Sequence, residues 1–151
     1  GDQLTHPGNT ALNNTPDGFT IAFWVFEGIG GTDWPLLQRN NGAGDGSWTV
    51  RRNFGGLQLR HNGQQLFNLL SGYFGSLYGW VHVAYTFDQV NDEWTVYYEG
   101  SQEGTGTFTG DVSTTNPIYV GGFGAAPNTI DDIRLYNRAL NPAEVEALAN
   151  Q

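Results

Sequence analysis

Acidic residues occur in two adjacent pairs, and paired carboxylates are the groups that cleave glycosidic bonds. In retaining glycosidases the general acid and the nucleophile stand about 5 Å apart. Asp92 and Glu93 fall in a predicted hairpin turn, and the neighbours Asp131 and Asp132 should point to opposite faces of a regular strand. Neither pair predicts that catalytic arrangement.

Other catalytic groups are equally sparse. The chain has no cysteine and no Gly-x-Ser-x-Gly motif, and His6, His61 and His82 are not near a candidate nucleophile in the sequence. His82 lies in an apolar run, where a histidine is usually a hydrogen-bonded core residue. We predict that the protein is not an enzyme; the catalytic alternative is a lyase or hydrolase that uses a Tyr and His pair.

Asp131 could instead bind a metal ion. A regular alternation would place Asp131 on the same face as Ile133 and Leu135, where a carboxylate needs a partner to offset its lost hydration. Ca²⁺ is such a partner, because it takes about six to eight oxygen ligands from carboxylates, amides and backbone carbonyls. The alternative is that Asp131 accepts backbone N–H groups or pairs with one of the two arginines that follow it.

Most of the cationic side chains are concentrated in the middle of the chain. Four of the six arginines lie in a span whose only acid is Asp45: Arg39, Arg51, Arg52 and Arg60. If the strands here pair as a meander, Arg51 and Arg60 share a sheet face with Gln58, and His61 is a further candidate. We predict that Arg51, Arg52 and Arg60 contact a ligand with carboxylate or sulfate groups. The alternative is a solvated sheet face.

Aromatic side chains on loops are candidate sugar contacts, because they stack on the apolar faces of pyranose rings. Trp34 lies between turn residues, and Tyr73 and Tyr78 lie in the glycine-rich stretch 71–79. We predict that these three contact ligand; the alternative is that such aromatics close the ends of a sandwich. The other tryptophans in predicted strands are expected in the core: Trp24, Trp80 and Trp94.

Composition limits the partners of the chain. It contains no lysine, and its formal charge of -9 opposes binding to nucleic acid or to anionic membrane surfaces. No stretch approaches the ~20 apolar residues that a membrane-spanning helix needs. With 151 residues and no cysteine, the chain predicts one domain, residues 1–151, that folds without disulfide bonds. We expect this module to be monomeric.

Glycines and prolines separate short alternating or apolar runs at intervals of about eight to twelve residues, which is typical of an all-β sandwich. Asn141, Pro142 and Glu144 predict the capped start of a helix. We therefore predict two packed antiparallel sheets and one short C-terminal helix. The predicted strands are 3–6, 19–27, 36–39, 47–52, 57–61, 65–69, 80–87, 94–99, 105–109, 117–121 and 129–136, and the predicted helix is 142–149.

Four segments occur in an order typical of one family: residues 17–25, 79–88, 93–100 and the closing 129–149, which contains Ile-Arg-Leu-Tyr-Asn-Arg-Ala-Leu. In these segments the chain resembles the laminin G-like domains with a concanavalin A-like jelly roll. The resemblance implies that fold, which carries sugar binding, protein adhesion and, in sister families, glycan cleavage. It also implies a structural Ca²⁺ site, with Asp131 and the early Asp2 among its ligands.

These observations favour a non-catalytic carbohydrate-binding or adhesion module that recognises a polysaccharide, with the arginines pointing to an acidic one. The alternative is a structural or protein-interaction domain of a surface adhesin or a multidomain enzyme, in contact with other domains of its parent protein. The acidic, lysine-free composition and the resemblance together predict a secreted or cell-surface bacterial protein, from which this module would be excised.

Overall fold

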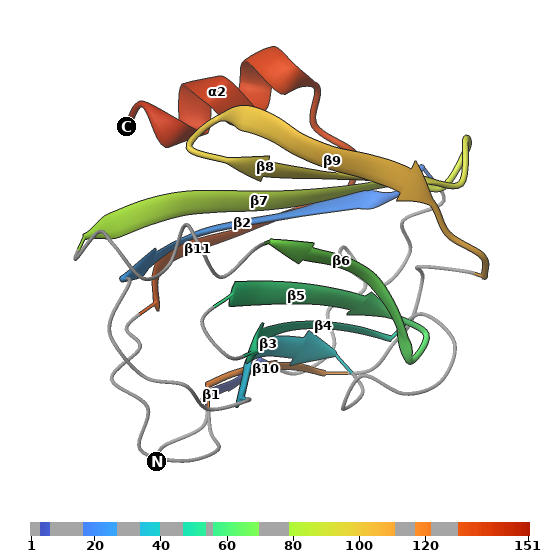
Figure 1. Cartoon of the computed structure of the whole chain (residues 1–151), viewed down its shortest axis with the longest axis horizontal. Coiled ribbons are helices and arrows are strands. Elements are labelled where there is room, and N and C mark those ends of the chain that lie inside the picture. The colour runs from blue at the N-terminus through green and yellow to red at the C-terminus, as the bar shows by residue number, and fades with distance from the viewer. Residues whose placement is uncertain are drawn as a thin grey trace.

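Strands in two antiparallel sheets, with one helix outside them, make up the described part of the chain in the computed structural model (Figure 1). The structure describes residues 4–6, 17–26, 34–39, 47–53, 56–69, 79–110, 117–121 and 130–151. The predicted fold class, an antiparallel β-sandwich with a short C-terminal helix, is confirmed. In the described ranges, no helix is long and apolar enough to cross a membrane.

The two sheets differ in how their strands are connected. The six-stranded sheet has the order β1 (Leu4–His6), β10 (Ile118–Val120), β3 (Trp34–Arg39), β4 (Trp48–Asn53), β5 (Gly56–His61) and β6 (Gln64–Leu69). The five-stranded sheet has the order β11 (Ile130–Tyr136), β2 (Phe19–Phe26), β7 (Trp80–Asp88), β8 (Glu93–Tyr98) and β9 (Ser101–Thr107). The predicted meander in the middle of the chain is confirmed, because β3 to β6 are neighbours in sequence and in the sheet.

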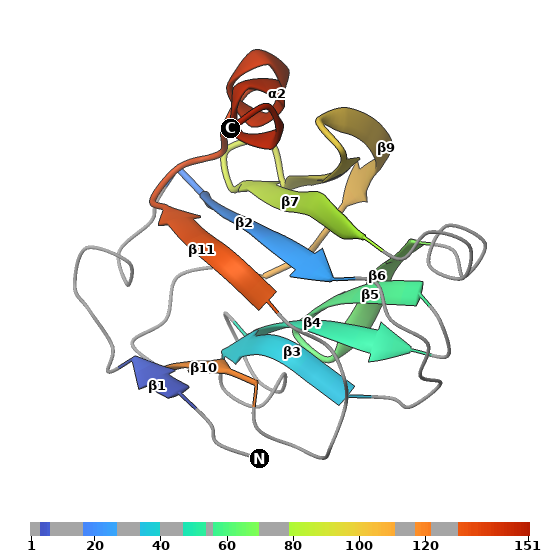
Figure 2. The same cartoon turned by 90° about the vertical axis from the view of Figure 1, so that its left-hand side faces the viewer.

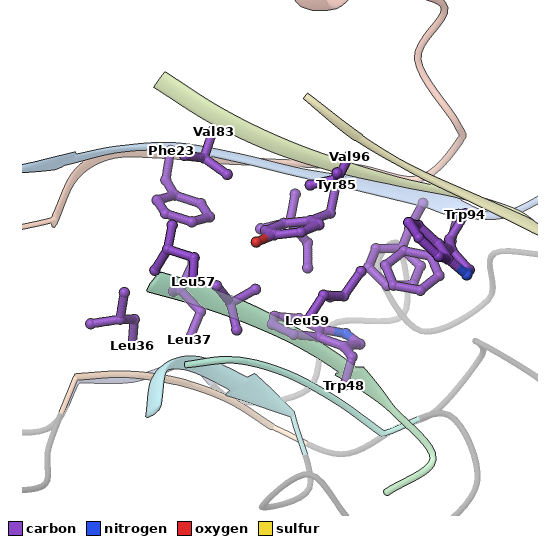
Figure 3. Close-up of a cluster of buried hydrophobic side chains, with 14 of the residues drawn as sticks. Phe23, Leu36, Leu37, Trp48, Leu57, Leu59, Val83, Tyr85, Trp94 and Val96 are labelled. Atoms are coloured by element: carbon purple, nitrogen blue, oxygen red, sulfur yellow. The ribbon is translucent and has the colours of Figure 1, made fainter. Parts of the chain in front are cut away.

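The inner faces of the two sheets form one core of aromatic and aliphatic side chains (Figure 3). The rings of Phe19 and Phe87 stack with centroids 4.5 Å apart, and Phe19 lies 5.9 Å from Trp48 of the opposite sheet. Tyr85 is fully buried between the sheets, so burial raises the pKa of its hydroxyl. Because successive side chains of a strand alternate, this core fixes which residues face outward.

Strand β9 begins four residues before the predicted start at residue 105. Its inward positions are Gly104 and Gly106, which pair with Val96 and Trp94 of β8. A Cβ at Gly104 would stand 2.4 Å from the ring of Phe67, which fills that space from the other sheet. The apolar side chains that fill the core beside β9 therefore come from neighbouring strands. For this reason the sequence of β9 alone does not show the alternation of polar and apolar residues that predicts a strand.

The outer face of the five-stranded sheet is partly covered by helix α2 (Pro142–Ala149), as Figure 2 shows. Val145 and Leu148 of the helix pack against Ala22 and Ala84 of the sheet, together with Tyr97. The small alanine side chains let the helix lie close to the strands. An eight-residue helix covers only part of a strand pair of this length.

The helix begins with the predicted capping box. The Asn141 side chain accepts a hydrogen bond from the Glu144 backbone at 3.0 Å, and the Glu144 carboxylate accepts one from the Asn141 backbone at 2.9 Å. The two terminal guanidinium nitrogens of Arg138, Nη1 and Nη2, also donate to the Glu144 carboxylate, at 2.8 Å and 2.6 Å. Hydrogen bonds from Arg138 and from the Asn141 backbone lower the pKa of Glu144 to about 2.

Loss of the cap should weaken the whole domain, because the helix is short and has few backbone hydrogen bonds of its own. We expect Asn141→Ala to lower the free energy of unfolding by about 1 kcal/mol in urea denaturation. Asn150→Ala is the matched control, since the described contact of its side chain is a hydrogen bond to the Glu146 carbonyl in the last turn, and it should cost less. Equal stabilities of Asn141→Ala and the wild type would contradict the assigned cap.

Candidate functional site

The outer face of the six-stranded sheet carries polar and cationic side chains. In the register, Arg51 pairs with Gln58 and Thr49 pairs with Arg60, while the core residues Val50 and Leu59 pair between them. The predicted sharing of one face by Arg51, Arg60 and Gln58 is therefore confirmed. We call this surface the arginine face and define it by Gln38, Thr49, Arg51, Gln58, Arg60 and Gln65.

Amide and hydroxyl groups form the floor of the arginine face. Gln38, Thr49 and Gln58 are only 5% or 6% exposed, whereas Arg51 and Arg60 are partly exposed. The Gln58 amide donates to the Gln65 amide oxygen at 2.7 Å, and an Arg60 guanidinium nitrogen donates to the Gly63 carbonyl at 3.0 Å. These contacts orient the side chains, and two guanidinium groups above an amide floor can donate to an anionic or hydroxyl-rich ligand.

Arg52 does not belong to the arginine face, so the predicted group of three arginines is wrong. Arg52 pairs with the core residue Leu57 and is 4% exposed. His61 pairs with Trp48, is 2% exposed and lies against the ring of Phe108 at 5.0 Å. Both point inward because each follows an outward residue, and side chains alternate along a strand.

Two of the predicted aromatic contacts, Tyr73 and Tyr78, lie outside the described residues.

Trp34 was expected in a loop, and this is wrong, because Trp34 begins β3 and its backbone pairs with Arg52. The register of β3 against β4 shifts between Pro35 and Leu37. A bulge lets the strand start before Pro35, which cannot donate a ladder hydrogen bond. The side chain of Trp34 is outside the described set.

A second bulge, in β11, changes the position of Asp131. Asp131 pairs with Trp24 but Arg134 pairs with Ala22, so three steps along β11 match two along β2. Asp132 takes the left-handed backbone conformation, with φ of 46°. Ile130, Ile133 and Leu135 all pack against the core, and Asp131 is exposed. The prediction that Asp131 shares a face with Ile133 and Leu135 is wrong, because the bulge shifts the alternation by one residue.

The described residues around Asp131 do not make a calcium site by themselves. One Asp131 carboxylate oxygen accepts from the Asp132 backbone at 2.8 Å, and both Asp132 oxygens bind Arg134, at 2.9 Å and 2.6 Å. Within the described ranges there is no group of three or more His, Asp or Glu residues that could hold a metal ion. Asp2 lies outside those ranges, so the Ca²⁺ site stays a prediction.

Sequence reasoning missed an aromatic surface on the five-stranded sheet, beyond the edge of α2. Trp80 was expected in the core, but it is 42% exposed and pairs with the partly exposed Phe26. Trp24 is also partly exposed, whereas Trp94 is buried as predicted. We call Trp24, Phe26 and Trp80 the aromatic platform. The alternation of residues 19–26 and 80–87 places these side chains on the outer face, but the sequence does not show that the helix leaves Trp80 exposed and Trp24 and Phe26 partly exposed.

His82 lies beside the aromatic platform. It is 2% exposed, and its ring centroid lies 5.4 Å from that of Trp24. The His82 backbone N–H donates to the Glu99 carboxylate, while the ring Nδ1 has no hydrogen-bond partner in the described part of the chain. Burial lowers the pKa of His82, the Arg134 guanidinium lowers it further, and the Asp132 carboxylate acts in the opposite direction.

The whole chain was compared with known families and proteins. The family model Laminin_G_3, of the concanavalin A-like lectin/glucanases superfamily, matches residues 1–146. The chain belongs to this family. The predicted resemblance is thereby confirmed over nearly the full length of this laminin G-like domain. The comparison with curated proteins gives no match.

Solved structures similar to this laminin G-like domain include binding domains of botulinum neurotoxins. The serotype D binding domain matches with a TM-score of 0.79 at 12% identity, covering 99% of this chain and 40% of that one. The type G receptor binding domain has a TM-score of 0.67 at 18% identity, with 98% and 46% covered. The neurotoxin DC domain in complex with SialylT has a TM-score of 0.73 at 16% identity, with 98% and 39% covered. The chain thus spans less than half of each, and at these identities the likeness shows the fold alone.

The buried His82 predicts a pH dependence of stability. Because folding lowers its pKa, the unfolded chain binds the proton more readily, so the stability from neutral His82 is lost as the pH falls through the unfolded value. We expect His82→Gln to reduce the loss of unfolding free energy between about pH 7 and about pH 5, measured by urea denaturation at each pH. Parallel pH profiles for variant and wild type would contradict this.

Proposed function

We propose that this laminin G-like domain is a non-catalytic carbohydrate-binding module that holds an acidic polysaccharide on its arginine face. The observation that carries the proposal is a separation of charge between the two halves of the sandwich. The described residues of β1, β3 to β6 and β10 include no Asp or Glu, and they contain four of the six arginines of the chain. Every described acidic residue lies in 17–26, 79–110 or 130–151, which form the five-stranded sheet, its turns and the helix.

The arginines of the acidic half are paired with acids of that half. Arg134 binds Asp132 at 2.6 Å, and Arg138 binds Glu144 at 2.6 Å. Although the formal charge of the chain is -9, among the described residues one half of the sandwich repels a polyanion and the half with Arg51 and Arg60 attracts it. Since charges separated by more than about 8 Å are largely screened at physiological salt, the local field of the arginine face governs binding there.

The chemistry of the arginine face suits a charged sugar. A guanidinium group offers a planar fork of donors that matches the two oxygens of a carboxylate or sulfate. The exposed side-chain amide of Gln65 lies beside Arg60, is held by the Gln58 amide at 2.7 Å, and can bind sugar hydroxyl groups. A uronate or sulfated polymer presents both kinds of group along its length.

The contacts of two described acidic residues support a binding role without catalysis, because their carboxylates are already bound by neighbouring side chains. Both Asp132 carboxylate oxygens bind Arg134, and a Glu93 carboxylate oxygen accepts from the Thr105 hydroxyl at 2.8 Å. The similarity to neurotoxin binding domains, one of which is in complex with SialylT, also supports a binding function. Because acidic polysaccharides of this kind are extracellular, the proposal includes a secreted or cell-surface location in a bacterium.

The test is native affinity electrophoresis in gels that contain alginate, polygalacturonate or chondroitin sulfate, with dextran as the neutral gel. We expect the acidic polymers to retard the wild type, and less so as salt is added. The double variant Arg51→Gln, Arg60→Gln should weaken binding by about tenfold or more, because each lost charge-assisted hydrogen bond contributes about 1.5 to 3 kcal/mol.

The double variant Arg134→Gln, Arg138→Gln is the matched control, because it removes the same two charges from the acidic half of the domain. This control should be retarded like the wild type. Retardation of the double variant equal to that of the wild type would show that the arginine face is not the site. Equal mobility of the wild type in all gels would contradict an acidic polysaccharide as the ligand.

A further inference from the structure

We propose that the aromatic platform of Trp24, Phe26 and Trp80 is a second carbohydrate site, which takes a pyranose ring of a neutral polysaccharide. It lies on the outer face of the five-stranded sheet, whereas the arginine face lies on the outer face of the other sheet. The two sites share no residue. The proposal for the platform can therefore be tested independently of the proposed acidic ligand.

The register places the platform next to the helix-covered part of the sheet. Ala22 and Ala84 pair with each other under α2, and two residues further along the strands Trp24 pairs with His82. After two more residues the outward pair is Phe26 and Trp80. The outward side chains thus change from alanines beneath the helix to large aromatic rings beyond it.

The ring of Trp80 is held in place but not covered. Its centroid lies 5.7 Å from that of Phe26, at an interplanar angle of 72°, so Phe26 supports it through an edge contact. Within the described residues, Trp80 is the aromatic side chain with a large exposed fraction, 42%. An indole that is already fixed by a neighbour loses little conformational freedom when a sugar ring stacks on it.

Hydrogen-bonding groups stand at one side of the platform. Asp131 is exposed and pairs with Trp24 across the strands β11 and β2. A carboxylate has about four lone-pair sites, and the described contact of Asp131 is one hydrogen bond from the Asp132 backbone. Aromatic rings beside carboxylate acceptors provide both the stacking surface and the hydroxyl partners that a pyranose requires.

The charge around the platform selects the class of ligand. Asp131 lies on the β11 side, next to Asp132, whose charge is paired with Arg134, and the Glu99 carboxylate lies next to His82 on the other side. Acidic groups repel uronate and sulfate, so the platform suits a neutral sugar and not the acidic polymer assigned to the arginine face. A protein partner with a broad apolar surface would meet these charges at the edge of only three aromatic side chains, which opposes such docking.

With one site on each outer face, a single domain would contact two polysaccharide chains at once. Occupation of both sites by a mixed polymer network would raise the overall avidity without any new contact. The module would then connect a neutral polymer to an acidic one.

The experiment titrates the intact chain with cellohexaose, xylohexaose, mannohexaose, laminarihexaose and chitohexaose, followed by calorimetry and by tryptophan fluorescence. We expect at least one of these probes to bind, and Trp80→Ala to weaken that binding by about tenfold. Trp80→Phe should keep part of the affinity, because a smaller ring still stacks. Val90→Ala is the matched control, since Val90 is 72% exposed and lies in the β7–β8 turn.

The variant Arg51→Gln, Arg60→Gln should bind the neutral probe as the wild type does, which separates this proposal from the proposed function. Circular dichroism and a denaturation midpoint check that each variant is folded. Binding by Trp80→Ala equal to that of the wild type would overturn the platform. A wild type that binds none of the five probes below about 10 mM would overturn it too, and would leave a protein surface as the occupant.

Discussion

Burial of one face of each sheet against the other is the constraint from which the remaining features of this domain follow. The stacked rings of Phe19 and Phe87, with Trp48 from the second sheet, hold the layers together. Since successive side chains alternate, every strand that contributes to this core must also present an outward row. Arg51 is outward for the same reason that its neighbour Arg52 is buried.

Register shifts interrupt four of the described strand pairs, and two of these shifts change the expected role of a residue. In β11 the bulge between Asp131 and Arg134 lets three hydrophobic residues reach the core and leaves Asp131 in solvent. In β3 the shift beside Pro35 extends the strand to include Trp34. A bulge leaves one residue unpaired in the hydrogen-bond ladder, and the side chains beyond it change the face of the sheet to which they point.

The outer faces differ because only one of them carries a helix. Helix α2 buries Ala22 and Ala84 but is too short to reach Trp80 at the far end of β7. The opposite face has no acidic residue among its described strands and keeps its arginines near amide side chains. A stacking surface and a cationic surface thus arise on opposite sides of one core, in a fold that many unrelated binding functions share.

The sequence by itself determined the fold class, nearly all strand positions and the capped helix, because these depend on local alternation and on Asn141, Pro142 and Glu144. It also placed Arg51 and Arg60 on one face, since a meander of short strands leaves few alternative registers. The start of β9 escaped prediction because its inward positions are glycines that Phe67 fills from the other sheet.

Tertiary structure alone decided the environments of Asp131, Trp80 and His82. The bulge that exposes Asp131 depends on pairing with a strand about a hundred residues earlier in the chain, and the sequence of β11 carries no sign of it. Trp80 stays exposed because the helix that could cover it ends elsewhere, and His82 is buried by neighbours from other strands. Burial and charge at a site are sums over contacts distant in sequence, so they exist only once the chain has folded.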